Sequence, residues 1–402
     1  MGYELERGRR KFGILPILVG AALSMGSSLS PAARAADLIV STNDAKYARV
    51  DGADTYPENP GPDTLTVLDA SVTPPTVVAT VEVATSIAGP PQAVATTPDG
   101  SLAVVSASNR YDYEQKQAVF ESFLQVIDLQ AAPPRVIERV EVGHHPQGLA
   151  INREGNLLLA ATVGGTLAVL TIDGKRFALQ EQIALSEKRL SGVSFTADGK
   201  AALVALRDEQ GLVVLDVDGQ SVTTERERVT TGVAPYAIDV SSDGRWAVVG
   251  NVGLPGLAKP GKLYGDADSF TLIDVSKRPF RAVQHVTVPS IPEGIAISPD
   301  GRWIAVQAMA GSQLPPDNPG WQAQGRVLLF EIRAGRAEPV ADLPAGVAGQ
   351  GIIFSADSRV LIAQFNVEKQ LAVYAVNGGQ LQDTGNRIQV SGGPVSIRSM
   401  PR

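Results

Sequence analysis

A phrase of eleven residues recurs along the chain and is clearest at 292–302, which reads PEGIAISPDGR. It predicts a short strand of small and apolar residues, Gly294 to Ser298, and then a tight turn. Pro299 presets φ for the turn, and Gly301 supplies the positive φ that it needs. A second strand, Trp303 to Gln307, follows at once. Further copies of the turn lie at Gly100, Gly155, Gly199, Gly244 and Ser358, and the five glycines, Gly301 included, are 55, 44, 45 and 57 residues apart.

This period is that of a four-stranded β-propeller blade rather than of a helical repeat. With 402 residues the chain could hold two ordinary domains, but a fixed repeat favours one closed ring. The segment 393–401 resembles the inner strand of a further copy that lacks its turn. We expect it to complete the first blade with strands at 38–41, 64–68 and 76–83, which removes sheet edges. The prediction is an all-β fold of seven blades in one domain, residues 36–402.

The remaining strands of each repeat share a pattern. A third strand often ends in Asp, as in Leu124-Gln125-Val126-Ile127-Asp128, and a more polar fourth strand such as Val136–Val142 alternates, as expected at a solvent-exposed edge. With the outer sequence Val140-Glu141-Val142-Gly143, the repeat resembles the YVTN and lactonase-like group of seven-bladed β-propellers over nearly all of residues 37–402. The resemblance implies a WD40-like architecture. The group includes sugar lactonases, amine-dehydrogenase large subunits and many exported proteins.

The first 35 residues differ from the rest of the chain. Four basic residues at 7–11 precede an apolar run, 12–25, and Ala33-Arg34-Ala35 has the small-x-small form of a cleavage site. This predicts an export signal (signal peptide, residues 1–35) and a periplasmic or secreted protein with no membrane insertion after cleavage. A transmembrane anchor is the alternative, but the run is short and contains Pro16. Arg9-Arg10 also resembles a twin-arginine start, so two export routes stay open.

Charge and cysteine content exclude several classes of function. The net charge is −7, and it falls to about −10 without residues 1–35, which carry five basic and two acidic side chains. An acidic chain without a basic cluster argues against nucleic acid or an anionic membrane as partner. The absence of cysteine excludes disulfides, covalent c-type haem, thiolate zinc and iron–sulfur centres. No cofactor is expected, and a divalent cation on oxygen ligands is the alternative.

Four connections between second and third strands are long, at 42–63, 108–122, 251–269 and 308–326. In a propeller these connections open on the face where the inner strands begin, which is where ligands usually bind. We expect two walls, one from blades 1 and 2 and one from blades 5 and 6, with a cleft between them. Solvated loop decoration is the alternative, since loops tolerate insertion. The predicted ligand contacts in the walls are Tyr111, Tyr113, Tyr264 and Trp321.

The residues that precede the inner strands should line the mouth of the central channel, and they are Gln92, Gln147, Ser191, Tyr236, Glu293 and Gln350. Four of them are predicted to bind the ligand: Gln92, Gln147, Tyr236 and Gln350. Glu293 is the only acid of the set, and a carboxylate among amides can act as a general base or hold a cation. A carboxylate that binds ordered water is the alternative. His145, just before blade 3, is the second candidate catalytic residue.

No metal site and no nucleophile follow from the sequence. His144 and His145 are neighbours whose side chains would point to opposite faces of a strand, so a histidine metal cage is not expected. There is no nucleophile elbow and no phosphate-binding glycine loop. A calcium site is an alternative to ordinary surface charge, on residues whose spacing matches no known loop: Asp51, Asp54, Asp266 and Asp268.

Together these observations predict an exported propeller that binds a small molecule or an exported protein partner on its loop-walled face. The alternative is a lactonase-type hydrolase that opens a lactone or similar ester, with Glu293 as base and His145 assisting. A third hypothesis is the large subunit of an exported dehydrogenase, which would co-purify with a redox subunit.

Overall fold

The computed structural model describes residues 37–253 and 265–402. The predicted export signal and Tyr264 lie outside the described residues. Ala36–Arg402 is a compact unit of its own, and it contains every strand that the structure describes. All regular elements in the described segments are β-strands. No helix in these segments is long and apolar enough to cross a membrane.

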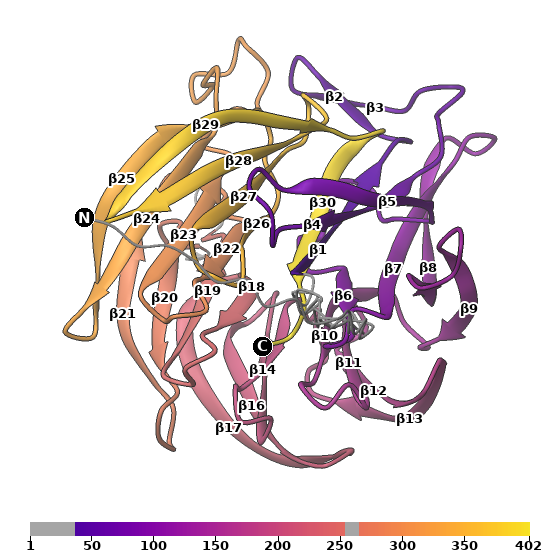
Figure 1. The fold of residues 1–402 in the computed structure, drawn as a ribbon, viewed down its shortest axis with the longest axis vertical. Helices are drawn as coiled ribbons and strands as arrows, with labels where there is room; N and C mark the ends of the chain where they lie inside the picture. Colours follow the sequence, from indigo (N-terminus) through magenta and orange to yellow (C-terminus); the bar gives the residue numbers. More distant parts are fainter. Residues whose placement is uncertain (1–36, 254–264) are drawn as a thin grey trace, which may run out of the picture. The chain divides into compact units, whose positions relative to one another are not determined.

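Seven four-stranded antiparallel sheets form the blades of a β-propeller (Figure 1). In blades 1 to 4 the strands run from the inner to the outer edge as β30 (Gly393–Ser399), β1 (Leu38–Asp44), β4 (Thr64–Asp69), β5 (Thr76–Glu82); β6 (Val94–Thr96), β7 (Leu102–Asp112), β8 (Gln117–Asp128), β9 (Arg135–Glu141); β10 (Pro146–Ile151), β11 (Leu157–Thr162), β12 (Thr166–Asp173), β13 (Arg176–Ala184); β14 (Val193–Phe195), β15 (Ala201–Ala205), β16 (Gln210–Asp218), β17 (Ser221–Val233).

In blades 5 to 7 they are β18 (Pro235–Val240), β19 (Trp246–Asn251), β20 (Ser269–Asp274), β21 (Arg281–Thr287); β22 (Gly294–Ile297), β23 (Trp303–Ala308), β24 (Arg326–Arg333), β25 (Arg336–Pro344); β26 (Ile352–Phe354), β27 (Val360–Phe365), β28 (Gln370–Asn377), β29 (Gln380–Gln389). A separate two-stranded hairpin, β2 (Ala48–Val50) and β3 (Ala53–Thr55), lies in the blade 1 insertion. The predicted fold class and the seven blades are confirmed.

Blade 1 joins N-terminal and C-terminal strands, as predicted. β30 pairs antiparallel with β1, with Val40 opposite Arg398. Beyond the strand, Met400 N donates to Leu38 O at 3.3 Å. Because β30 supplies the inner strand of this sheet, β1 has no open edge and the ring of blades is closed.

The recurring turn is held by its serine and aspartate as well as by its glycine. Trp303 N donates to Ser298 Oγ at 2.8 Å, and Ser298 Oγ donates to Asp300 Oδ1 at 2.5 Å. The same carboxylate oxygen accepts Arg302 N at 3.1 Å, while Gly301 has a φ of 69°. Local side-chain bonds of this kind compete well with extended structure. The aspartate of the repeat is therefore a structural residue of the turn.

The core lies between neighbouring blades. Trp303 of blade 6 packs in one apolar cluster with Phe354 of blade 7, and Trp246 of blade 5 packs in another with Phe330 of blade 6. The two tryptophans are 4% and 6% exposed. Both tryptophans thus pack between blades, and each blade depends on the next for burial of its faces.

Candidate functional site

The long connections differ from the prediction in form. The predicted blade 2 loop, 108–122, is mostly a continuation of strands, since β7 runs to Asp112 and β8 begins at Gln117. The blade 1 and blade 6 connections also touch one another, because Arg49 Nη1 donates to Gln313 O at 3.3 Å. The two predicted walls therefore contact each other across blade 7, the blade that lies between blades 6 and 1 in the ring and has only a short connection.

Tyrosines fix the wall of blades 1 and 2. Tyr56 stacks on Tyr111 with ring centroids 3.7 Å apart and planes at 4°, and Tyr47 and Tyr113 add edge contacts to this pair. The stacked faces of Tyr56 and Tyr111 are occupied by each other. Of the predicted loop aromatics that are described, Tyr113 and Trp321 are exposed, at 37% and 39%, and present apolar surface to solvent.

A buried charge cluster supports the same wall. Lys46 Nζ lies 3.0 Å from Asp44 Oδ1 and 2.6 Å from Asp63 Oδ2. Burial raises the pKa of Asp44 to about 6, although the Lys46 charge acts in the opposite direction. Asp44 Oδ2 also accepts Ala88 N at 3.0 Å. The cluster thereby holds the segment that leads into the channel mouth.

Glu293 stands at the mouth, immediately before β22. It is half-buried, but its Oε2 is enclosed and has no hydrogen-bond partner among the described residues. Burial raises the pKa of Glu293 from 4.5 to about 7, and the charges of Arg207 and Arg49 lower it. A carboxyl with this pKa is shared between its neutral and ionised forms near pH 7, which suits a general base.

Arg207 faces the same mouth from blade 4. It is 9% exposed, its Nη1 donates to Ala234 O at 2.7 Å, and its Cζ lies 4.1 Å from the ring centroid of Tyr236. Its Nε has no partner among the described residues. Arg207 and Glu293 thus influence one another electrostatically, and each keeps a buried polar atom that no described side chain satisfies.

Gln350 and Tyr236 meet beside Gly89. A Cβ built at Gly89 would lie 3.1 Å from Gln350 Oε1 and 3.8 Å from Tyr236 Oη, so both polar tips converge on this glycine. Gln350 is 4% exposed, and its Oε1 lacks a partner in the described part of the chain. Burial and the Glu293 charge both raise the pKa of Tyr236. Three of the predicted mouth residues, Tyr236, Glu293 and Gln350, therefore come together.

Gln92 has a different position from the other amides. Its Nε2 donates to Ile238 O at 2.6 Å, and its Oε1 accepts Ile238 N at 2.9 Å. The side chain reaches from blade 2 to the inner strand of blade 5, and both ends of its amide are occupied. Gln92 therefore links the blades beneath the mouth. Gln147 is half-buried at the start of β10.

His145 does not join Glu293. Its Nδ1–H donates to Glu121 O at 2.8 Å, and its ring stacks on Phe120 with centroids 4.4 Å apart. These contacts fix it against the blade 2 hairpin. The cations whose charges act on Glu293 are Arg207 and Arg49. Sequence reasoning assigned neither arginine to the mouth, since neither stands at a repeat position.

No group of three His, Asp or Glu side chains within 37–253 and 265–402 is placed to hold a metal ion. Of the aspartates considered for calcium, Asp54 accepts Arg49 Nη2 at 2.5 Å and Asp268 accepts Ile291 N at 3.2 Å. Their carboxylates serve separate loops.

No protein-family model matches the chain, and no curated protein matches it in sequence. Many solved structures match its fold. The periplasmic gluconolactonase of Pseudomonas aeruginosa has 16% identity and a TM-score of 0.64, covering 91% of this chain and 99% of its own. The two chains share the β-propeller fold. A Bacteroides fragilis protein provisionally assigned as a 6-phosphogluconolactonase has 15% identity and a TM-score of 0.67 over 92% of this chain and 100% of its own.

Kuenenia stuttgartiensis hydrazine synthase also matches, with 20% identity and a TM-score of 0.56 over 73% of this chain and 78% of its own. Proteins named for different reactions thus share this fold. At such identities the likeness establishes the fold alone, and activity must be argued from the site.

Proposed function

We propose that the channel mouth binds a small, hydroxyl-rich molecule. The observation that carries this proposal is the convergence of buried polar atoms without partners: Glu293 Oε2, Gln350 Oε1 and Arg207 Nε. A buried polar group left unpaired costs about 1–3 kcal/mol, so a ligand that supplies its partners gains affinity. Two acceptors and one donor complement a molecule with at least two hydroxyl groups and one carbonyl or ring oxygen.

A hydroxylated lactone fits this pattern of donors and acceptors. The pKa of Glu293 favours hydrolysis of such a lactone as a second candidate function. Glu293 in its ionised form takes a proton from water as the water oxygen attacks the lactone carbonyl carbon. The Arg207 guanidinium stabilises the oxyanion that develops. The ring C–O bond then breaks and Glu293 returns the proton to the leaving alkoxide, which gives a hydroxy acid. The likeness to a gluconolactonase supports this choice of substrate class.

The test uses the full chain, gluconolactone and two variants. Hydrolysis is measured above the spontaneous rate, and binding of the acyclic polyol sorbitol is measured by calorimetry. Glu293→Gln should abolish the catalysed rate, whereas Glu181→Gln, an exposed residue on the outer strand of blade 3, should leave it unchanged. Full activity in Glu293→Gln would reject Glu293 as the base. Absence of both catalysis and polyol binding in the unmodified chain would reject the mouth as a small-molecule site.

We also propose that the protein acts outside the cytoplasm, in the periplasm or beyond. The support is the basic start, apolar run and small-x-small sequence of residues 1–35. Cell fractionation should recover a shortened chain that begins at Ala36. Recovery of the uncut chain in the cytoplasm would contradict this.

A further inference from the structure

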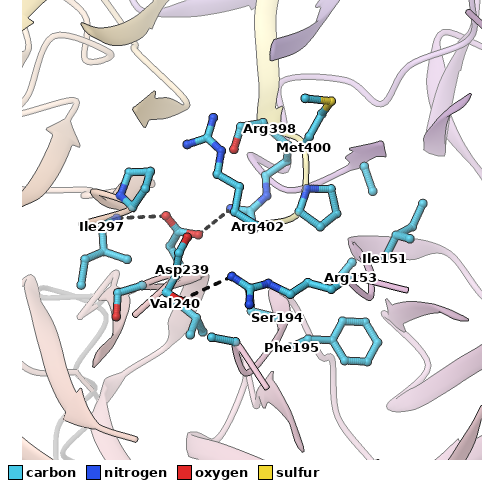
Figure 2. Close-up of a pocket in the computed structure, with 18 of the residues that line it drawn as sticks. Ile151, Arg153, Ser194, Phe195, Asp239, Val240, Ile297, Arg398, Met400 and Arg402 are labelled. Carbon is cyan, nitrogen blue, oxygen red and sulfur yellow. Dashed lines mark hydrogen bonds and ion pairs between the residues drawn. The ribbon is translucent and has the colours of Figure 1, made fainter. Parts of the chain in front are cut away.

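A cavity lies at the end of the channel opposite the mouth, where the inner strands end. It has a volume of about 100 Å³ and is lined by residues of all seven blades (Figure 2). The polar side chains that matter for its chemistry are Thr96, Arg153, Asp239, Arg398 and Arg402. Figure 2 shows Arg153 and Arg398 reaching toward Asp239 from different sides. We call this cavity the axial pocket.

The axial pocket is separate from the channel mouth. Along β18, Tyr236 belongs to the mouth, Ile238 is bonded to Gln92, and Asp239 opens into the pocket. The Gln92 amide therefore lies between the two sites. A ligand in the axial pocket would not touch Glu293, so the two sites can be tested independently.

The charges of the axial pocket do not balance. Asp239 is the only acid among the described residues that line the pocket, with Oδ2 accepting Ile297 N at 2.9 Å and Oδ1 3.4 Å from Arg398 Nη1. Arg402 is paired with Asp37 at 2.7 Å. Arg153 has no carboxylate partner among the described residues and makes one long hydrogen bond, 3.4 Å, to Ser242 O. Arg153 is exposed, so its guanidinium is hydrated and open to an anion from solvent.

Thr96 gives an independent sign of a ligand. It is 1% exposed, and its Oγ1 has no hydrogen-bond partner in the described part of the chain. The equivalent positions of five other repeats are apolar, namely Ile151, Phe195, Val240, Ile297 and Phe354, and blade 1 has Ser399 there. A hydroxyl placed where the repeat uses an apolar side chain costs stability unless something binds to it.

Size and lining define the ligand further. Carbon-rich side chains such as Ile151, Phe354 and Met400 surround the polar groups, which favours a ligand with an apolar part over a bare inorganic ion. An apolar cavity of about 150 Å³ holds benzene, so the axial pocket accommodates a smaller molecule. Arginine binds carboxylates through two parallel hydrogen bonds.

We propose that the axial pocket binds a small aliphatic monocarboxylate of the size of acetate or propionate. Its carboxylate pairs with Arg153 and accepts a hydrogen bond from Thr96, and its alkyl group lies against Ile151 and Met400. The Asp239–Arg398 pair remains in place and limits the site to a single negative charge.

Calorimetric titration of the full chain with sodium acetate tests this, with sodium chloride and sodium benzoate at equal ionic strength as controls. Acetate should bind saturably, and neither control should. Arg153→Gln should weaken acetate about tenfold or more, the effect of losing a charged hydrogen-bond partner, and Thr96→Val about threefold or more. Thr96→Val removes an unpaired buried hydroxyl, so its melting temperature should not fall.

Two further variants locate the bound acetate. Arg176→Gln changes an exposed arginine on the outer strand of blade 3 and should leave acetate affinity unchanged. Glu293→Gln should also leave it unchanged, because the mouth is a separate site. The proposal is overturned if acetate does not bind, if Arg153→Gln and Arg176→Gln have the same effect, or if Glu293→Gln abolishes acetate binding while Arg153→Gln preserves it.

Discussion

Glu293→Gln should make the protein more stable above neutral pH. Burial raises the pKa of Glu293 from 4.5 to about 7, so the folded chain holds this proton more tightly than the unfolded chain. The stability that follows is complete below pH 4.5 and is lost as the pH rises through about 7. At 1.36 kcal/mol per pKa unit, the loss amounts to about 3 kcal/mol. Gln carries no charge at any pH and avoids this loss.

Urea unfolding followed by tryptophan fluorescence at about pH 4.5 and at about pH 8 measures the effect. The free energies of unfolding of the two proteins should be similar at the lower pH, and the variant should exceed the parent by about 2–3 kcal/mol at the higher. Glu181→Gln changes an exposed carboxyl, and its free energy of unfolding should equal that of the parent at both pH values. An identical difference between Glu293→Gln and the parent at the two pH values would refute a raised pKa for Glu293, and with it the argument for a base poised near neutrality.

Two structural predictions concern the closure of the ring. Gln92→Leu leaves Ile238 N without its acceptor across the channel, and should lower the free energy of unfolding by about 1–3 kcal/mol, seen as a lower urea midpoint; an unchanged midpoint would show that Gln92 does not link the blades. Removal of residues 393–402 exposes the edge of β1, and should give aggregated protein in size-exclusion chromatography; a stable monomer would contradict the role of β30 in closing blade 1.

The fold could be predicted because its determinants are local and repeated. Each copy of the turn carries its own hydrogen-bonding residues, as Ser298 and Asp300 show, and the C-terminal strand carries the apolar pattern of an inner strand without a turn. The stacking of Tyr56 on Tyr111 was beyond reach, because it joins two insertions whose paths no repeat specifies. The same holds for the extension of β7 and β8 into the predicted blade 2 loop.

Of the channel mouth, the sequence predicts only those residues that stand at equivalent positions of the repeat. Tyr236, Glu293 and Gln350 stand at equivalent positions of different blades, so the ring places them around one axis. Arg207 comes from a connection between strands, and its burial against Tyr236 depends on the loop that carries it. His145 directly precedes an inner strand in the sequence, but in the structure its ring stacks on Phe120 of the neighbouring hairpin.

In a propeller of this kind the departures from the repeat identify the sites better than the repeat itself. One position of the inner strands holds small or apolar residues in five copies, Asp239 in blade 5 and Arg398 in blade 1, as the equivalent set shows: Ala95, Ala150, Ser194, Asp239, Ala296, Ile353 and Arg398. Glu293 breaks the pattern of uncharged residues at the mouth in the same way, and at the next strand position Thr96 and Ser399 are polar where the other copies are apolar. Burying each of these polar groups costs free energy. The residue type that the other blades use at the same position would avoid that cost. Their presence at the two ends of one channel, with the Gln92 amide between them, is the physical reason to expect two ligands of different chemistry.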